Sequence, residues 1–218
     1  MATQQSRSNS LERYAPLSGA LFAVLLVLAF GSFGDSAEPG QAAGIRSDAY
    51  VDDPEKALMG GQLLGLAAFS LAWFGGSLRQ ALVGAHERLA ALAYGGTLLA
   101  AAMLLAGAAT HGALGLRADE VGALDPEVAG AVGDVGTLFI GAVAPIGMAL
   151  VALATALASL RTGALLPKWA AWVTLVLGIG LLALPINWAL TVVFAAWALV
   201  VGIALTARGG GGTSRSND

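Results

Sequence analysis

The chain has 218 residues, of which 57% are hydrophobic and 11% are charged, and its mean hydropathy is +0.76. Soluble domains carry roughly 25% charged residues, so this composition indicates a membrane protein. A net charge of −3 argues against nucleic acid as a partner, and the absence of cysteine excludes disulfides, thiolate metal sites and thioether-linked haem.

The amino-terminal part predicts a tail followed by a first transmembrane helix. Residues 1–12 are polar and lack periodicity, which predicts a disordered tail. Residues 15–33 lie in an uncharged run that is long enough to cross a bilayer. Arginines ahead of this run would also fit a secretory signal peptide, but Asp35 stands where a cleavage site needs a small residue. A retained helix is therefore the preferred interpretation.

Two further helices are expected after an acidic loop. Residues 35–56 form this loop, with room for one short helix. Asp-Pro-Glu at 53–55 is typical of a helix start, because Asp caps the free N–H groups, Pro suits the first helical position and Glu favours the positive helix end. We expect the second helix over 54–78 and the third over 89–114, joined by a short polar connection.

The fourth helix is expected to be the central one. A second Asp-Pro-Glu at 125–127 opens an apolar run over 126–160, which ends at Arg161. As a continuous helix this run would span roughly 50 Å, more than the roughly 30 Å of the hydrocarbon core. It carries Asp134, the one carboxylate inside a long apolar segment, and Pro145, where we expect a kink.

The last apolar stretch must cross the membrane twice. Residues 169–207 are uncharged and would reach nearly 60 Å as one helix, about twice the core thickness. Proline, asparagine and tryptophan at 185–188 favour a tight hairpin between helices over 168–184 and 188–207. Residues 209–218 are predicted to form a second disordered tail.

The whole segment 13–208 is therefore predicted to be all-α, a polytopic domain of six transmembrane helices in one bundle. The two tails and the connections at 79–88 and 161–168 hold eight Lys/Arg against three Asp/Glu, whereas the opposite side holds three against eleven. Because basic residues stay on the cytoplasmic side, both termini are expected in the cytoplasm, with the chain in the plasma membrane.

The second and fourth helices share their flanking motifs. Each begins with Asp-Pro-Glu and ends with Ser-Leu-Arg, at 77–79 and 159–161. Inverted transporter repeats need opposite orientations, whereas these two helices run the same way. An internal duplication and a chance recurrence in an Ala/Leu-rich chain both remain open, and chance is preferred.

Four polar side chains are candidates for a cavity near the outer face: Gln62, His111, Asp134 and Thr137. A charged Asp at the bilayer centre costs about 2.5–3.5 kcal/mol, so such residues usually have a role. Counting back from the end of the fourth helix places Asp134 in the headgroup layer, however, where an interfacial or structural role is preferred. His111 should lie in the same layer and could pair with Asp134 to relay a proton, although a helix-end histidine is the preferred interpretation.

The surroundings of these candidates favour packing over chemistry. Gln62 lies beside glycines in a small-xxx-small spacing, which suits a hydrogen bond between helices. Glycines at 130, 133 and 136 indicate either close packing around Asp134 or a broken helix.

Catalytic and cofactor motifs are not found in the sequence. It lacks paired histidines at metal spacing, Gly-x-Ser-x-Gly, a phosphate-binding loop and a second carboxylate within a helix. The acidic residues of 48–55 lack the spacing of a calcium loop. We therefore expect no catalytic residue, no metal, no cofactor and no enzyme activity.

Several short motifs occur in a recognisable order: RYAPLSG at 13–19, WFGGSLR at 73–79, Asp134, RTG at 161–163 and PKW at 167–169. This order resembles a group of uncharacterised multi-pass membrane proteins, a domain of unknown function common in high-GC Gram-positive bacteria. The resemblance implies a six-helix plasma-membrane protein and brings no activity, cofactor or catalytic residue.

Two functions fit these observations. The first is a non-catalytic membrane module that binds or scaffolds a protein partner, a second copy of the chain, or membrane lipid. The alternative is transport or sensing of a small solute, cation or proton through a cavity around Asp134, beneath an acidic mouth that concentrates cations. The first is preferred because polar residues inside the predicted helices are scarce.

Overall fold

The computed structural model describes residues 14–33, 42–163, 165–183 and 188–209. Within these ranges the regular structure is entirely helical. In chain order the elements are η1 (Ala15–Leu17), α2 (Ser18–Phe33), α3 (Ala43–Asp52), α4 (Pro54–Val83), α5 (Glu87–Val121), α6 (Pro126–Leu138), the π-helical η3 (Phe139–Val143), α7 (Ala144–Thr162), α8 (Lys168–Ala183) and α9 (Trp188–Gly209).

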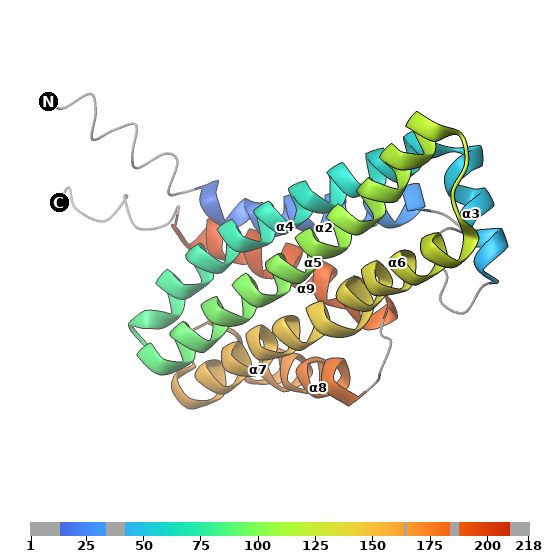
Figure 1. Ribbon diagram of the computed structural model, residues 1–218. Coiled ribbons are helices and arrows are strands. Elements are labelled where there is room, and N and C mark those ends of the chain that lie inside the picture. The colour runs from blue at the N-terminus through green and yellow to red at the C-terminus, as the bar shows by residue number, and fades with distance from the viewer. Residues whose placement is uncertain (1–13, 34–41, 164, 184–187, 210–218) are drawn as a thin grey trace, which may run out of the picture.

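The long helices lie side by side in one elongated bundle (Figure 1). α4 packs against α2 and α5, α5 packs against α7, and α7 packs against α8, while α9 returns to α2. α2 begins and α9 ends at one end of the bundle, which we call the terminal end. The short α3 lies at the opposite end, the α3 end, where it contacts α6, α5 and α4.

The length and composition of the helices identify a multi-pass membrane protein. Five segments are long and apolar enough to cross a bilayer: Ala15–Phe33, Pro54–Val83, Glu87–Val121, Pro126–Thr162 and Ala189–Arg208. The most apolar window of the fourth is 61% buried, against 33% for the first and the last, so the fourth is the most enclosed of the five. α8 is apolar but has only 16 residues, so a sixth crossing stays a prediction.

Two helices extend beyond their predicted ends. α4 continues five residues past position 78, and α5 covers 87–121 rather than 89–114. The hydropathy pattern marks the part of a helix that is immersed in lipid, whereas polar helix formers such as Arg79-Gln80 continue the hydrogen-bonded coil into water. α5 continues to Val121 and is followed by Gly122, which adopts the left-handed conformation (φ 66°) found at the ends of many helices.

The fourth predicted helix contains a π-helical segment directly before its proline. Pro145 has no N–H group and cannot donate to the carbonyl of Gly141, four residues earlier. The N–H of Ala144 donates instead to the carbonyl of Phe139, five residues earlier, which is the π-helical pattern. The wider turn of η3 therefore accommodates Pro145 within the helical segment Pro126–Thr162.

Some predicted features fall outside the described residues. These are the tail 1–12, all but the first residue of the tail 209–218, and the hairpin over 185–187. The start of the last helix at Trp188 agrees with the prediction. In the first acidic loop, the short helix considered from sequence is α3.

Glycine allows the backbones of α5 and α7 to touch. An added Cβ at Gly147 would lie 2.5 Å from the backbone nitrogen of Ala100 and 2.6 Å from the carbonyl oxygen of Gly96. A Cβ at Gly96 would in turn lie 2.7 Å from the carbonyl oxygen of Gly147. Small residues at helix crossings are typical of membrane bundles, where close packing replaces the hydrophobic effect between helices.

We predict that Gly147→Ala lowers the free energy of unfolding by about 1–3 kcal/mol, because the methyl group would meet backbone atoms that cannot turn aside. Gly95→Ala is the matched control, because an added Cβ there meets nothing within 4 Å. Thermal unfolding in detergent should show a lower Tm for Gly147→Ala and an unchanged or higher Tm for Gly95→Ala. Equal Tm values for the two variants would contradict the contact.

Candidate functional site

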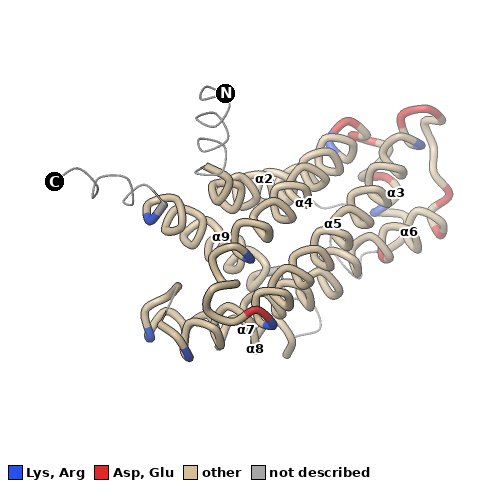
Figure 2. The backbone as a smooth tube through the Cα atoms, turned by 90° about the vertical axis from the view of Figure 1, so that its left-hand side faces the viewer, with Lys and Arg blue, Asp and Glu red and all other residues tan. Residues whose placement is uncertain are grey.

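The two ends of the bundle differ in the sign of the charge that predominates there (Figure 2). Acidic residues gather at the α3 end, on α3, the start of α4, the end of α5 and α6. Most of the described Lys and Arg residues lie at the terminal end, near the end of α4, the start of α5, the end of α7, the start of α8 and the end of α9. The candidate polar site belongs to the acidic α3 end.

One face of α3 is buried against α5 and α6. Arg46, Ser47 and Tyr50 are each at most 3% exposed, and they lie within one turn of each other, so they share this face. The hydroxyl of Ser47 donates to the carbonyl of Leu124 in the loop between α5 and α6, at 3.2 Å. Ile45 on the outer face is 58% exposed. α3 therefore covers this end of the bundle.

The guanidinium of Arg46 forms an ion pair with Asp134. Its Nη1 donates to Asp134 Oδ1 at 2.5 Å and to the carbonyl of Gly130 at 3.3 Å. The two partners differ in burial, because the side chain of Arg46 is 1% exposed and that of Asp134 is 61% exposed. The carboxylate of Asp134 therefore lies on the exposed side of α6, and the guanidinium of Arg46 contacts it from the buried side.

Glycines on α6 make room for α3. An added Cβ at Gly133 would lie 2.9 Å from Cδ of Arg46, and one at Gly130 would lie 3.1 Å from Cβ of Ala43. The close packing predicted around Asp134 is therefore confirmed at these two positions, and the neighbour is α3.

The second buried contact of α3 joins Tyr50 to His111. The hydroxyl of Tyr50 and Nδ1 of His111 share a hydrogen bond of 2.5 Å, and the ring of Phe33 lies 4.8 Å from the imidazole, centroid to centroid. Burial raises the pKa of Tyr50 from 10 to about 12, and the nearby positive charge of Arg46 opposes this rise. The phenol is therefore neutral at physiological pH and available as a hydrogen-bond donor.

The four side chains predicted to line a cavity have different surroundings. His111 and Thr137 are buried, whereas Gln62 and Asp134 are exposed. Nε2 of His111 faces Gly136, where an added Cβ would lie 2.9 Å away. Within the described residues, Nε2 of His111 and Oγ1 of Thr137 have no hydrogen-bond partner.

α3 provides a different partner for each of the two residues whose pairing was the alternative interpretation from sequence. His111 bonds to Tyr50 and Asp134 bonds to Arg46, one turn apart on the same short helix. The residues missed from sequence are thus Arg46 and Tyr50. The available signal was the i, i+4 spacing of the two large side chains, within a loop whose other charges are all acidic apart from Lys56 at its end.

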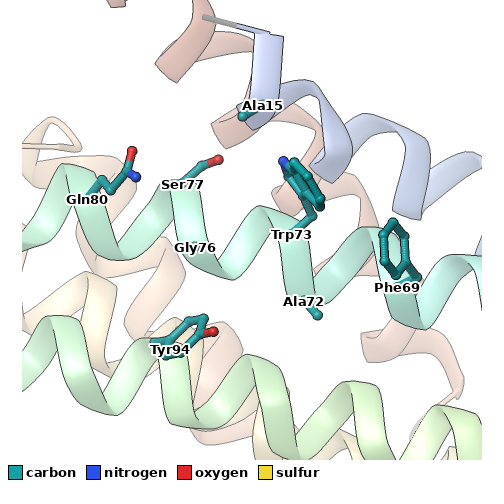
Figure 3. Close-up of a pocket in the computed structure, with 8 residues that line it drawn as sticks. All are labelled: Ala15, Phe69, Ala72, Trp73, Gly76, Ser77, Gln80 and Tyr94. Atoms are coloured by element: carbon teal, nitrogen blue, oxygen red, sulfur yellow. The ribbon is translucent and has the colours of Figure 1, made fainter. Parts of the chain in front are cut away.

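A lateral pocket of about 440 Å³ lies near the terminal end, away from these residues (Figure 3). Its apolar part is lined by Ala15, Phe69, Ala72 and Trp73, and the rest by Gly76, Ser77, Gln80 and Tyr94. Figure 3 shows Phe69, Trp73, Ser77 and Gln80 along one side of α4, with Tyr94 on the neighbouring α5. None of the four predicted cavity residues lines it.

Metal ligands do not cluster at either place. In the described part of the chain, no group of three or more His, Asp and Glu side chains is arranged to hold a metal ion.

We predict that Asp134→Asn destabilises the protein more than Arg46→Met does. The first change removes the carboxylate that pairs with the buried guanidinium, whereas the second removes the buried charge itself. The loss for Asp134→Asn should be about 1–3 kcal/mol, the size of a charged hydrogen bond. Chemical unfolding of both variants and of the double variant in detergent would measure this, and additive effects in the double variant would contradict the pair.

The contact of Tyr50 also predicts a pH dependence. Because the pKa is higher in the folded state, the stabilisation by the neutral phenol is complete below pH 10 and is lost as the pH rises towards 12. The wild type should therefore lose about 2–3 kcal/mol more than Tyr50→Phe over this range. Parallel stability curves for the two proteins between pH 9 and about 12 would contradict the burial of the hydroxyl.

Comparison of the chain with models of protein families, with curated proteins and with solved structures finds no match. The resemblance to a family of multi-pass membrane proteins therefore stays a prediction, and function has to be argued from the geometry.

Proposed function

We propose that the chain is a six-pass membrane protein of the bacterial plasma membrane, with both termini in the cytoplasm. In this proposal it acts without catalysis, as a module that binds or scaffolds a protein partner or lipid. α8 provides the sixth crossing, and the basic terminal end faces the cytoplasm. The acidic α3 end then lies outside.

One observation carries the choice of a binding module over a transporter: Asp134, the carboxylate within the fourth span, is already paired with a buried arginine. Arg46 is buried and holds Asp134 in an ion pair, while Tyr50 occupies Nδ1 of His111. A carboxylate that carries protons or cations must exchange partners during the cycle, and a paired, mostly exposed Asp134 is poorly placed for this.

Transport remains the second candidate because of two buried polar atoms. Nε2 of His111 on α5 and Oγ1 of Thr137 on α6 are buried and have no hydrogen-bond partner among the described residues. Movement of α3 away from α5 and α6 would separate Arg46 from Asp134 and Tyr50 from His111, which would free both titratable groups for a gated cation or proton site.

Fusions of a fluorescent protein and of alkaline phosphatase test the topology. Fluorescence without phosphatase activity is expected at Asp218 and in the 84–86 connection, and phosphatase activity is expected at 122–125 and between Ile186 and Asn187. Because an odd number of crossings places the termini on opposite sides, phosphatase activity at Asp218 would overturn the proposal.

Flux measurements separate the binding module from the transporter. Proteoliposomes that contain the wild-type chain should show the same pH-driven and cation-driven flux as empty liposomes, and Asp134→Asn should change nothing. Flux that appears with the wild type and is lost in Asp134→Asn would favour transport. A folded variant at the assay temperature, shown by its unfolding curve in parallel, would exclude unfolding as the cause.

A further inference from the structure

The lateral pocket on α4 and α5 differs in polarity along its length. Phe69 and Trp73 form its apolar part, with 63% and 56% of their surfaces exposed and their rings 5.9 Å apart. Ser77 and Gln80 follow on the same side of α4, towards the terminal end (Figure 3). The groove therefore changes from aromatic to polar as it approaches the end of the helix.

We propose that this groove binds one anionic phospholipid, with an acyl chain against Phe69 and Trp73 and the headgroup beside Gln80. The proposal rests on the membrane placement and orientation argued above and names the ligand of the binding module. In that placement the open side of the groove faces lipid, so the occupant must come from the bilayer or from another membrane protein.

The length of the groove matches one leaflet. Phe69 and Gln80 are eleven residues apart on α4, a rise of about 16 Å along the helix. One leaflet contributes about half of the roughly 30 Å hydrocarbon core. With Gln80 at the level of the headgroups, Phe69 therefore lies near the middle of the membrane, as an acyl chain requires.

Positive charge near the polar end of the groove favours the negatively charged headgroup of a phospholipid. The guanidinium of Arg79 lies 5.9 Å from the ring centroid of Tyr94, which lines the groove. Arg79 therefore lies beside a residue that lines the groove, and it is next to Gln80 in the sequence. Arg88 lies in the first turn of the neighbouring α5, which begins shortly after α4 ends. An anionic phosphate ester at this level meets hydrogen-bond donors and positive charge together.

The groove has free space next to Gly76. An added Cβ there meets no atom within 4 Å, so a larger side chain would enter the groove and not the protein interior. Gly95 on α5 is also free of contacts within 4 Å and lies outside the groove. Gly76→Leu therefore blocks the proposed site, and Gly95→Leu is a control of equal size and hydrophobicity.

Native mass spectrometry of protein released from nanodiscs tests this assignment. The discs contain equal amounts of phosphatidylglycerol and phosphatidylcholine with identical acyl chains. The wild type should retain one phosphatidylglycerol in preference to phosphatidylcholine. Gly76→Leu should lose this adduct, while Gly95→Leu keeps it. Arg79→Gln should reduce the preference about fivefold, the effect of one basic side chain near an anionic lipid surface.

Three results would overturn the proposal. These are retention by Gly76→Leu at the wild-type level, equal retention of both lipids by the wild type, and a dimer mass that replaces the lipid adduct and falls in Gly76→Leu. The last would assign the groove to a second copy of the chain. Each variant must keep the Tm of the wild type, and the topology fusions report separately on membrane placement.

Discussion

The burial of Arg46 is the constraint on which the α3 end of the molecule depends. A guanidinium that is 1% exposed needs a negative partner and hydrogen-bond acceptors, because a buried charge without them is strongly destabilising. α6 supplies both, through the carboxylate of Asp134 and the carbonyl of Gly130. The glycines of α6 let the arginine approach closely enough to reach them. A short helix between two long ones is thereby fixed in place, and with it the ring of Tyr50 against His111.

The rest of the bundle relies on small residues. At the crossing of α5 and α7, Gly96 and Gly147 leave no space for a side chain on either helix. In lipid the apolar faces of helices gain little from leaving the solvent, so van der Waals contact between backbones must hold them together. This explains why the fourth span is both rich in alanine and the most enclosed of the five.

The sequence predicted the long helices well because bilayer thickness and hydropathy specify them directly. Their ends were predicted less well, since Arg79-Gln80 continues α4 in water, where hydropathy carries no information. The π-helical turn before Pro145 follows from the missing N–H group, but its exact form depends on packing. Two of the candidate residues, His111 and Asp134, contact α3 in the structure, and their role as a site stays a prediction. Their partners were missed because Arg46 and Tyr50 lie in a loop that composition marks only as polar, and a contact across more than 80 residues has no local pattern.

The two ends of the bundle differ in whether their polar groups are paired within the fold or available to a ligand. At the α3 end, the buried Arg46 pairs with the exposed Asp134, and the other acidic side chains in the described part of this end are at least partly exposed. At the terminal end, Gln80 and Arg79 lie on the surface beside an aromatic groove. Buried, mutually paired charges fix a conformation, whereas exposed donors next to an apolar surface are available to a ligand that has both characters. A phospholipid has both, with a charged headgroup and an apolar chain. In the orientation that we propose, this division of charge would also place the proposed lipid-binding groove on the side where basic residues and lipid headgroups meet.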